Sequence, residues 1–174
     1  MPGFSTGGCT DAKTIDQQAA FEVGNGLLLS TLAGATFIHD IGYMEAGFTS
    51  SLELLTMADE MIGHIKRVHA GIAVSPEHLA LDLIHEIGPG GNFLATPHTV
   101  KHLRNEIHIT DFFDRQTYQA WEEAGRKTIE DRAREKTQWI LENHVPESLP
   151  EEVVKQVDAI VKDLDDRRKE LFKL

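Results

Sequence analysis

The chain has 174 residues, of which 41% are hydrophobic and 26% are charged, and its formal net charge is −11 at pH 7. This length suffices for one domain with a hydrophobic core, and the acidic charge argues against nucleic acid as a partner, because phosphate binding requires a basic face. The short apolar runs, the lack of a secretory signal and the single cysteine, Cys9, predict a cytoplasmic protein with neither a membrane segment nor an internal disulfide.

A small, polar, glycine-rich loop begins at Ser5 and leads directly into a helix. Such loops usually follow a strand and line a site. Only Met1–Phe4 precede this one, so we expect no strand before the first helix. Thr14 and Gln17 fit a capping box, which predicts that the helix begins there and runs to about Ala33.

Two glycines, Gly24 and Gly26, lie inside this helix, although glycine weakens a helix. Close packing of the helix against a neighbouring backbone would explain both of them. Gly34 is then a natural C-terminal stop.

The next segment, ATFIHDIGYM at residues 35–44, is a short apolar run with β-branched and aromatic residues. It predicts a buried parallel strand that is apolar on both faces. His39 and Asp40 fall towards the C-terminal end of this strand. Residues 42–49, GYMEAGFT, are expected to form a loop.

Two further helices follow the loop. Ser50 and Glu53 form a second capping box, and a wide apolar stripe continues from there to Gly71. The stripe comprises Leu54, Leu55, Ala58, Met61, Ile62, Ile65 and Val68. In the next helix Ser75 is the predicted N-cap, Pro76 occupies the first helical position, and Gly88 is the stop.

The remaining pattern is mostly helical. Residues 92–95 predict one brief strand and residues 98–107 a short helix, and from about Gln116 the helical pattern continues to the end, with an interruption at 145–150. The last helix carries an apolar seam of Val153, Val157, Ile160, Leu164 and Leu171. Alternating strands and helices indicate an α/β protein with a parallel sheet. Two strands cannot form such a sheet, so we expect the chain to be the last part of something larger.

Four stretches carry a resemblance to a known family. They are GGCTDAKTIDQQAAFE, LAGATFIHDIGYMEAGFTSSLELL, GPGGNFLATPHTVKHLRNE and DFFDRQTYQAWEEAGRKTIEDRA. In this order and spacing they resemble the C-terminal third of the trimethylamine methyltransferase family, the corrinoid-dependent amine methyltransferases. The likeness extends from about Gly7 to Ile160.

This resemblance implies the fold and the activity. Residues 1–145 would be the last strand–helix units of a truncated (β/α)8 TIM barrel, with residues 146–174 as an additional C-terminal helix packed on it. Family members move a methyl group from trimethylamine, glycine betaine or a similar amine to Co(I) of a corrinoid. The implied partners are a separate corrinoid carrier protein and a small amine, with a homo-oligomer at full length and no tightly bound metal. The chain alone is expected to be inactive.

The resemblance also directs attention to particular side chains, because barrel chemistry lies at the C-terminal ends of strands. We expect Glu45, His39 and Asp11 to be catalytic, and Asp40, Tyr43 and His98 to face the substrate or the corrinoid. Aromatic faces and carboxylates are suited to a quaternary ammonium, which cannot be hydrogen-bonded.

Each of these assignments has an alternative. Asp11 and Lys13 could instead cap the first helix and pair with each other, and His39 could be a satisfied buried histidine. His98, His102 and Glu106 share one helical face, which would suit a small metal-dependent hydrolase. A non-catalytic module that binds a partner through the C-terminal helices is a third possibility.

Overall fold

The computed structural model describes residues 3–172, with side chains described up to Arg168. The chain divides into two units, residues 1–140 and residues 141–174. The first unit combines helices with two small two-stranded sheets, and the second contains α8 (Glu151–Phe172). The described residues thus form a helix-rich protein with strands of both parallel and antiparallel pairing.

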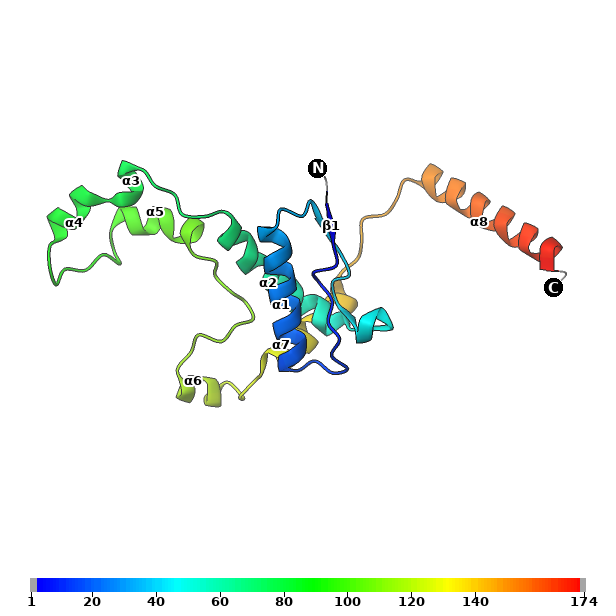
Figure 1. The fold of residues 1–174 in the computed structure, drawn as a ribbon, viewed down its shortest axis with the longest axis horizontal. Coiled ribbons are helices and arrows are strands. Elements are labelled where there is room, and N and C mark those ends of the chain that lie inside the picture. Colours follow the sequence, from blue (N-terminus) through cyan, green and yellow to red (C-terminus); the bar gives the residue numbers. More distant parts are fainter. Residues whose placement is uncertain (1–2, 173–174) are drawn as a thin grey trace. The chain divides into compact units, whose positions relative to one another are not determined.

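The first sheet forms where no strand was predicted. β1 (Phe4–Ser5) pairs in parallel with β2 (Phe37–Ile38), and α1 (Gln17–Leu32) connects them (Figure 1). A parallel pair requires such a crossover, so the three elements form one strand–helix–strand unit. The expectation that no strand precedes the first helix is therefore wrong. A strand of two residues has no periodicity to detect and exists only through its pairing with β2.

The two faces of this sheet differ in burial. On one face, Ser5 Oγ lies 2.5 Å from Ser30 Oγ of α1, and Ile38 packs against the hydrophobic core. On the other face, Phe4 and Phe37 are 76% and 56% exposed. The prediction of a strand buried on both faces is therefore wrong for this one, whereas its parallel pairing is confirmed.

The predicted strand at residues 35–44 is interrupted. Asp40 and Gly42 have φ angles of 64° and 85°, which turn the chain after β2. β3 (Tyr43–Met44) then pairs antiparallel with β4 (Thr49–Ser50), and the 3₁₀ turn η1 (Glu45–Gly47) joins them. The expected loop is therefore a short hairpin.

α1 begins later than predicted. Its N-cap is Asp16, whose Oδ1 accepts hydrogen bonds from Gln18 N at 2.9 Å and Ala19 N at 3.1 Å. A capping box starting at Thr14 is therefore wrong, because the carboxylate of Asp16 already satisfies the free N–H groups. The end of the helix is confirmed: Gly34 follows it with a φ of 79°.

α2 (Leu52–His69) shows the same small displacement. Ser51, not Ser50, is the N-cap, and its Oγ accepts a hydrogen bond from Leu54 N at 3.1 Å. Gly71 follows the helix with a φ of 71°, as the predicted stop requires.

The core lies where α1 and α2 pack against each other and against the hairpin. Its buried members are Ala12, Ala19, Val23, Leu27, Met44, Leu54 and Ala58. A second cluster joins Met57 of α2 to Phe112 and to Ala133 of α7 (Ile129–Asn143). The predicted stripe of α2 is confirmed in its centre, but Leu55 and Val68 are exposed.

The middle of the chain departs from the predicted elements in two places. The single helix expected after Ser75 is broken at Ala80, whose φ is 49°, into α3 (Pro76–Leu79) and α4 (Leu81–Ile87). No strand forms at residues 92–95, which lie in a described region; Leu94 N donates to Asn92 Oδ1 in a local turn instead. An isolated apolar run forms a strand only when a neighbouring strand is available to pair with it.

The helices after residue 96 follow the predicted pattern except at residues 124–128, where Gly125 and Arg126, with φ angles of 96° and 56°, break the continuous helix expected there. α5 spans Pro97–Glu106, α6 spans Tyr118–Glu123, and α7 and α8 come next. The seam of α8 is exposed at Val153, Val157, Ile160 and Leu164, while the side chain of Leu171 lies outside the described residues. Packing of α8 on the first unit stays a prediction. Among the described helices, none has the length and apolar composition needed to cross a membrane.

Candidate functional site

The opening loop, residues 6–15, lies beside the end of β2 and the hairpin. Gly8 N donates to His39 O at 3.4 Å, Thr10 N donates to Tyr43 O at 3.0 Å, and Glu45 N donates to Ala12 O at 3.2 Å. These backbone bonds bring together the segments that carry Asp11, His39, Asp40, Tyr43 and Glu45. We call this group, at the C-terminal ends of β1 and β2, the strand-end site.

Glu22 of α1 anchors the opening loop. Its Oε2 accepts hydrogen bonds from Thr10 Oγ1 at 2.6 Å and from Asp11 N at 2.9 Å. The Thr10 hydroxyl, followed by the Asp11 N–H, holds the pKa of this carboxyl below its ordinary value. Sequence reasoning missed Glu22, because only the folded loop brings it to residues that lie more than ten positions earlier.

Asp11 itself is exposed, and its side chain extends from a fixed backbone. Besides the bond from its N–H to Glu22, its carbonyl oxygen accepts a hydrogen bond from Lys13 Nζ at 2.8 Å. The alternative in which Asp11 and Lys13 cap α1 is wrong, since Asp16 does so.

His39 and Asp40 form a close pair at the end of β2. His39 Nδ1 lies 2.9 Å from Asp40 Oδ1, and both side chains are partly exposed. The imidazole also stacks on Phe37, with ring centroids 5.9 Å apart, and meets the edge of Phe4 at 6.3 Å. Phe4 and Phe37 therefore belong to the site's surroundings, although no sequence motif marked them.

Tyr43 and Glu45 flank a buried anchor. Met44 is in the core, whereas Tyr43 and Glu45 on either side of it are exposed. Glu45 and Ala46 both have a φ of 51°, in the left-handed region that costs a non-glycine residue of order 1 kcal/mol or more. Such strain persists only where the surrounding structure imposes it, and it places Glu45 in the turn of the hairpin.

His98 is not among the residues that the strand-end site gathers. It lies on α5, where its Nε2 is 2.8 Å from Glu77 O and its ring lies against that of His102. A role for His98 toward substrate or corrinoid stays a prediction.

The predicted metal ligands on α5, His98, His102 and Glu106, have different neighbours in the structure. His102 and Glu106 do come within reach of a common ion, but their third neighbour is His78 rather than His98. Glu106 is moreover engaged by Arg67, whose Nη2 lies 2.6 Å from Glu106 Oε2 and whose Nε donates to Glu106 O. The hydrolase alternative built on His98 thus lacks its first ligand.

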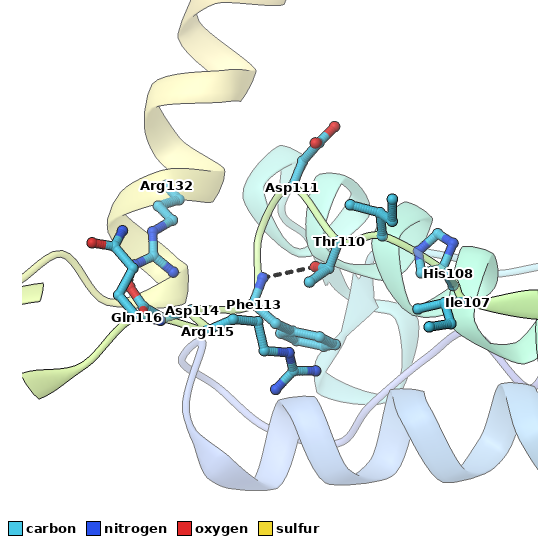
Figure 2. Close-up of a pocket in the computed structure, with 10 residues that line it drawn as sticks. Ile107, His108, Thr110, Asp111, Phe113, Asp114, Arg115, Gln116 and Arg132 are labelled. Atoms are coloured by element: carbon cyan, nitrogen blue, oxygen red, sulfur yellow. Dashed lines mark hydrogen bonds and ion pairs between the residues drawn. The ribbon is translucent and has the colours of Figure 1, made fainter. Parts of the chain in front are cut away.

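A cavity of about 480 Å³ lies along residues 107–116 (Figure 2). Arg132 of α7 forms one wall; it donates to Phe112 O at 2.6 Å and pairs with Asp114. Thr110 Oγ1 accepts a hydrogen bond from Phe113 N at 2.9 Å. Sequence reasoning did not find this cavity, because it depends on contacts between α7 and an irregular segment.

Comparisons with known proteins add a family relationship. The model of a family described as trimethylamine methyltransferase (MTTB) matches residues 1–171. A trimethylamine methyltransferase MttB of Desulfitobacterium hafniense is 37% identical over 95% of this chain, and MttB2 of Methanosarcina mazei is 36% identical over 98% of it. A glycine betaine methyltransferase of D. hafniense is 33% identical over 92% of the chain. The chain spans about a third of the length of each of these relatives, between 33% and 34%.

Proposed function

Because the chain belongs to the trimethylamine methyltransferase family, we propose that it takes part in moving a methyl group from a tertiary or quaternary amine to Co(I) of a corrinoid. Relatives named for trimethylamine and for glycine betaine support this substrate class. The proposal concerns a complete protein of which this chain is a part: a cytoplasmic homo-oligomer that meets the corrinoid on a separate carrier protein. The chain by itself would be inactive, since it holds only part of the site.

The strand–helix–strand unit β1–α1–β2 supports placement in a (β/α)8 barrel. Ser5 and Ile38 face α1 and the core, while Phe4, Phe37 and His39 stand on the opposite, open face. In a barrel the helices lie outside the sheet and the other face points inward. The open aromatic face would then be the interior of the barrel, and the strand-end site would lie at its catalytic end.

The side chains of the strand-end site suit a cationic amine. Asp11, Asp40 and Glu45 supply carboxylates, and Tyr43 supplies an exposed aromatic ring. A fully substituted ammonium has no N–H to donate, so it is held by charge and by aromatic faces. Lys13 offsets part of the negative charge, since its ammonium group lies beside the backbone of Asp11.

The charge change of the reaction assigns a role to the carboxylates. When bound, the reduced cobalt of the corrinoid supplies the nucleophile. The nitrogen of the substrate loses its positive charge as the methyl group leaves, so a carboxylate stabilises the bound substrate more than the transition state. Glu45 and Asp11 therefore contribute to binding and orientation, while the hairpin and the opening loop help to exclude water.

The His39–Asp40 pair has a positioning role in this scheme. Transfer from a quaternary amine moves no proton, so the imidazole needs neither to donate nor to accept one. Its 2.9 Å contact with Asp40 and its stacking on Phe37 instead hold the ring in one orientation beside the substrate.

The observation that carries the proposal is the backbone pairing that joins the opening loop to the hairpin. We test it in the complete protein by following the absorbance of the Co(I) corrinoid protein, amine by amine. Glu45→Gln is expected to raise KM for the cationic amine about tenfold, equivalent to about 1.4 kcal/mol, with kcat not lowered and raised to the extent that the carboxylate favours the bound substrate over the transition state. Glu123→Gln removes an exposed carboxylate of α6 and is the matched control. An unchanged KM for Glu45→Gln, or a loss confined to kcat, would contradict the assigned role.

A further inference from the structure

Two histidines and a carboxylate meet between α2 and the segment that follows α5. Glu60 and His64 lie one turn apart on α2, and His108 approaches them from the irregular segment. Glu60 Oε1 is 3.4 Å from His64 Nε2 and 3.3 Å from His108 Nε2. One ligand atom from each of the three residues lies within 4.8 Å of the others. We call this group the α2 triad.

These distances match those between the ligands of one metal ion. Atoms placed tetrahedrally about 2.05 Å from Zn²⁺ lie about 3.3–3.4 Å from one another. Both nitrogens of the α2 triad are at this distance from the same oxygen. The His64 and His108 rings meet edge to face, with centroids 4.4 Å apart, so their nitrogens can converge on one point.

The ring nitrogen of His64 on α2 has no hydrogen-bond partner among the described residues. His64 Nε2 is buried, and its contact with Glu60 Oε1, at 3.4 Å, is an ion-pair distance. Burying a polar atom without a hydrogen bond is destabilising. A metal ion would give this nitrogen a partner, since the Nε2 atom of a neutral imidazole is a common metal ligand.

Hydrogen bonds from the irregular segment hold the Glu60 carboxylate of the α2 triad in place. Its oxygens accept hydrogen bonds from the Thr110 hydroxyl and the Asp111 N–H, two donors that are not themselves proposed ligands. Second-shell donors of this kind orient a metal-binding carboxylate. The same Thr110 hydroxyl accepts hydrogen bonds from Phe112 N and Phe113 N, so the segment and the carboxylate are tied together.

Gly63 provides the space for His108. A Cβ at this position would lie 2.6 Å from Cε1 and 2.8 Å from Nε2 of His108, closer than a side chain tolerates. Glycine is unfavourable in a helix interior, but here the absence of a Cβ permits the approach of the imidazole to α2.

We propose that Glu60, His64 and His108 bind a divalent transition-metal ion, Zn²⁺ above all, which cross-links α2 to residues 107–116. Two imidazoles with one carboxylate favour zinc over calcium or magnesium, which prefer oxygen ligands. Each histidine would present the lone pair of Nε2 and carry its proton on Nδ1. The cluster of His78, His102 and Glu106 is a weaker candidate, because the guanidinium of Arg67 already neutralises Glu106. This proposal is independent of the methyl transfer, and it departs from the expectation that the chain has no metal of its own.

The test measures Zn²⁺ binding to the untagged, chelator-stripped 174-residue chain by titration calorimetry, with the visible absorbance of a Co²⁺ derivative as a second readout. We expect one ion per chain. His64→Ala and the nearly isosteric Glu60→Gln should each weaken binding by at least about 100-fold, since loss even of a second-shell partner costs about 10–100-fold. His102→Ala is the matched control and should bind as the unaltered chain does.

Circular dichroism and metal-free thermal melts show whether each variant keeps the fold. If His64→Ala does not fold, Glu60→Gln provides the test of Zn²⁺ binding. Zn²⁺ should raise Tm in the unaltered chain and in His102→Ala only. Failure of the unaltered chain to bind Zn²⁺ would overturn the proposal. So would binding that survives both substitutions in the α2 triad, or binding that is lost in His102→Ala instead.

Discussion

Gly26 of α1 faces the backbone of the opening loop, and we expect Gly26→Ala to destabilise the protein although alanine favours helices. A Cβ on Gly26 would overlap the carbonyl oxygen of Gly7 and lie 3.2 Å from its carbon. Gly24, two residues away, has only Met61 Sδ nearby, at 3.8 Å, which is an ordinary contact. Gly24→Ala is therefore the matched control on the same helix.

The two effects at Gly26 oppose each other. Alanine in place of glycine stabilises a helix interior by about 0.8–1 kcal/mol. Forcing an extra carbon into a closely packed site costs about 1–3 kcal/mol, and the overlap here is with backbone, which cannot rotate away. The loop would have to move, which strains its bonds to the hairpin. We expect Gly26→Ala to lower the free energy of unfolding by about 1 kcal/mol and Gly24→Ala to raise it by up to about 1 kcal/mol.

Urea denaturation of the two variants and the unaltered chain measures this difference. A gap of about 2 kcal/mol corresponds to roughly 4–8 °C in Tm for a chain of this size. If Gly26→Ala were as stable as Gly24→Ala, the close approach of the opening loop to α1 would be refuted, and the geometry of the strand-end site would lose its support.

Three further predictions concern the caps, the core and the anchor of the opening loop. Asp16→Ala should cost about 1 kcal/mol as the loss of an N-cap, whereas Thr14→Ala should be near neutral; equal losses in urea denaturation would restore Thr14 as the cap. Leu54→Ala should lower the free energy of unfolding by about 2–5 kcal/mol, because Leu54 is fully buried. Leu55→Ala should lower it much less, because Leu55 is exposed. Comparable unfolding midpoints for the two variants would contradict the packing of α2. The pKa of Glu22 is lowered from 4.5 in the folded state, so its contribution to stability is complete above that value and is lost as the pH falls through the lower folded value. Glu22→Gln should therefore flatten the loss of stability below about pH 4.5, and superimposable pH profiles of the unfolding midpoint would show that Glu22 does not anchor the loop.

Much of the helical structure could be predicted from the chain itself. The apolar periodicity of α2 and the apolar seam of α8 are local features, because residues three and four positions apart lie on the same face of a helix. The helix starts were less accessible: Thr14 and Ser50 are plausible caps by residue type, and only the backbone of the folded protein selects Asp16 and Ser51.

The fold brings together the segments that carry Asp11, His39, Asp40, Tyr43 and Glu45, whereas His98 lies apart on α5, and the roles of all six stay predictions. His39 and Asp40 lie towards the C-terminal end of an apolar run, and this position indicated them as candidate site residues. Glu22, Phe4 and Phe37 have no such mark, because their roles come from contacts with the opening loop and with β1.

The order of residues alone was sufficient for the family and for most of the helices, since both depend on patterns within short stretches. The pairing of β1 with β2, the joining of the opening loop to the hairpin, and the meeting of Glu60 and His64 with His108 were decided by the tertiary structure. The physical reason is common to all three. Each contact joins segments that are distant in the chain, so it forms only when α1 and α2 pack with the hairpin and when Phe112 packs against Met57 of α2.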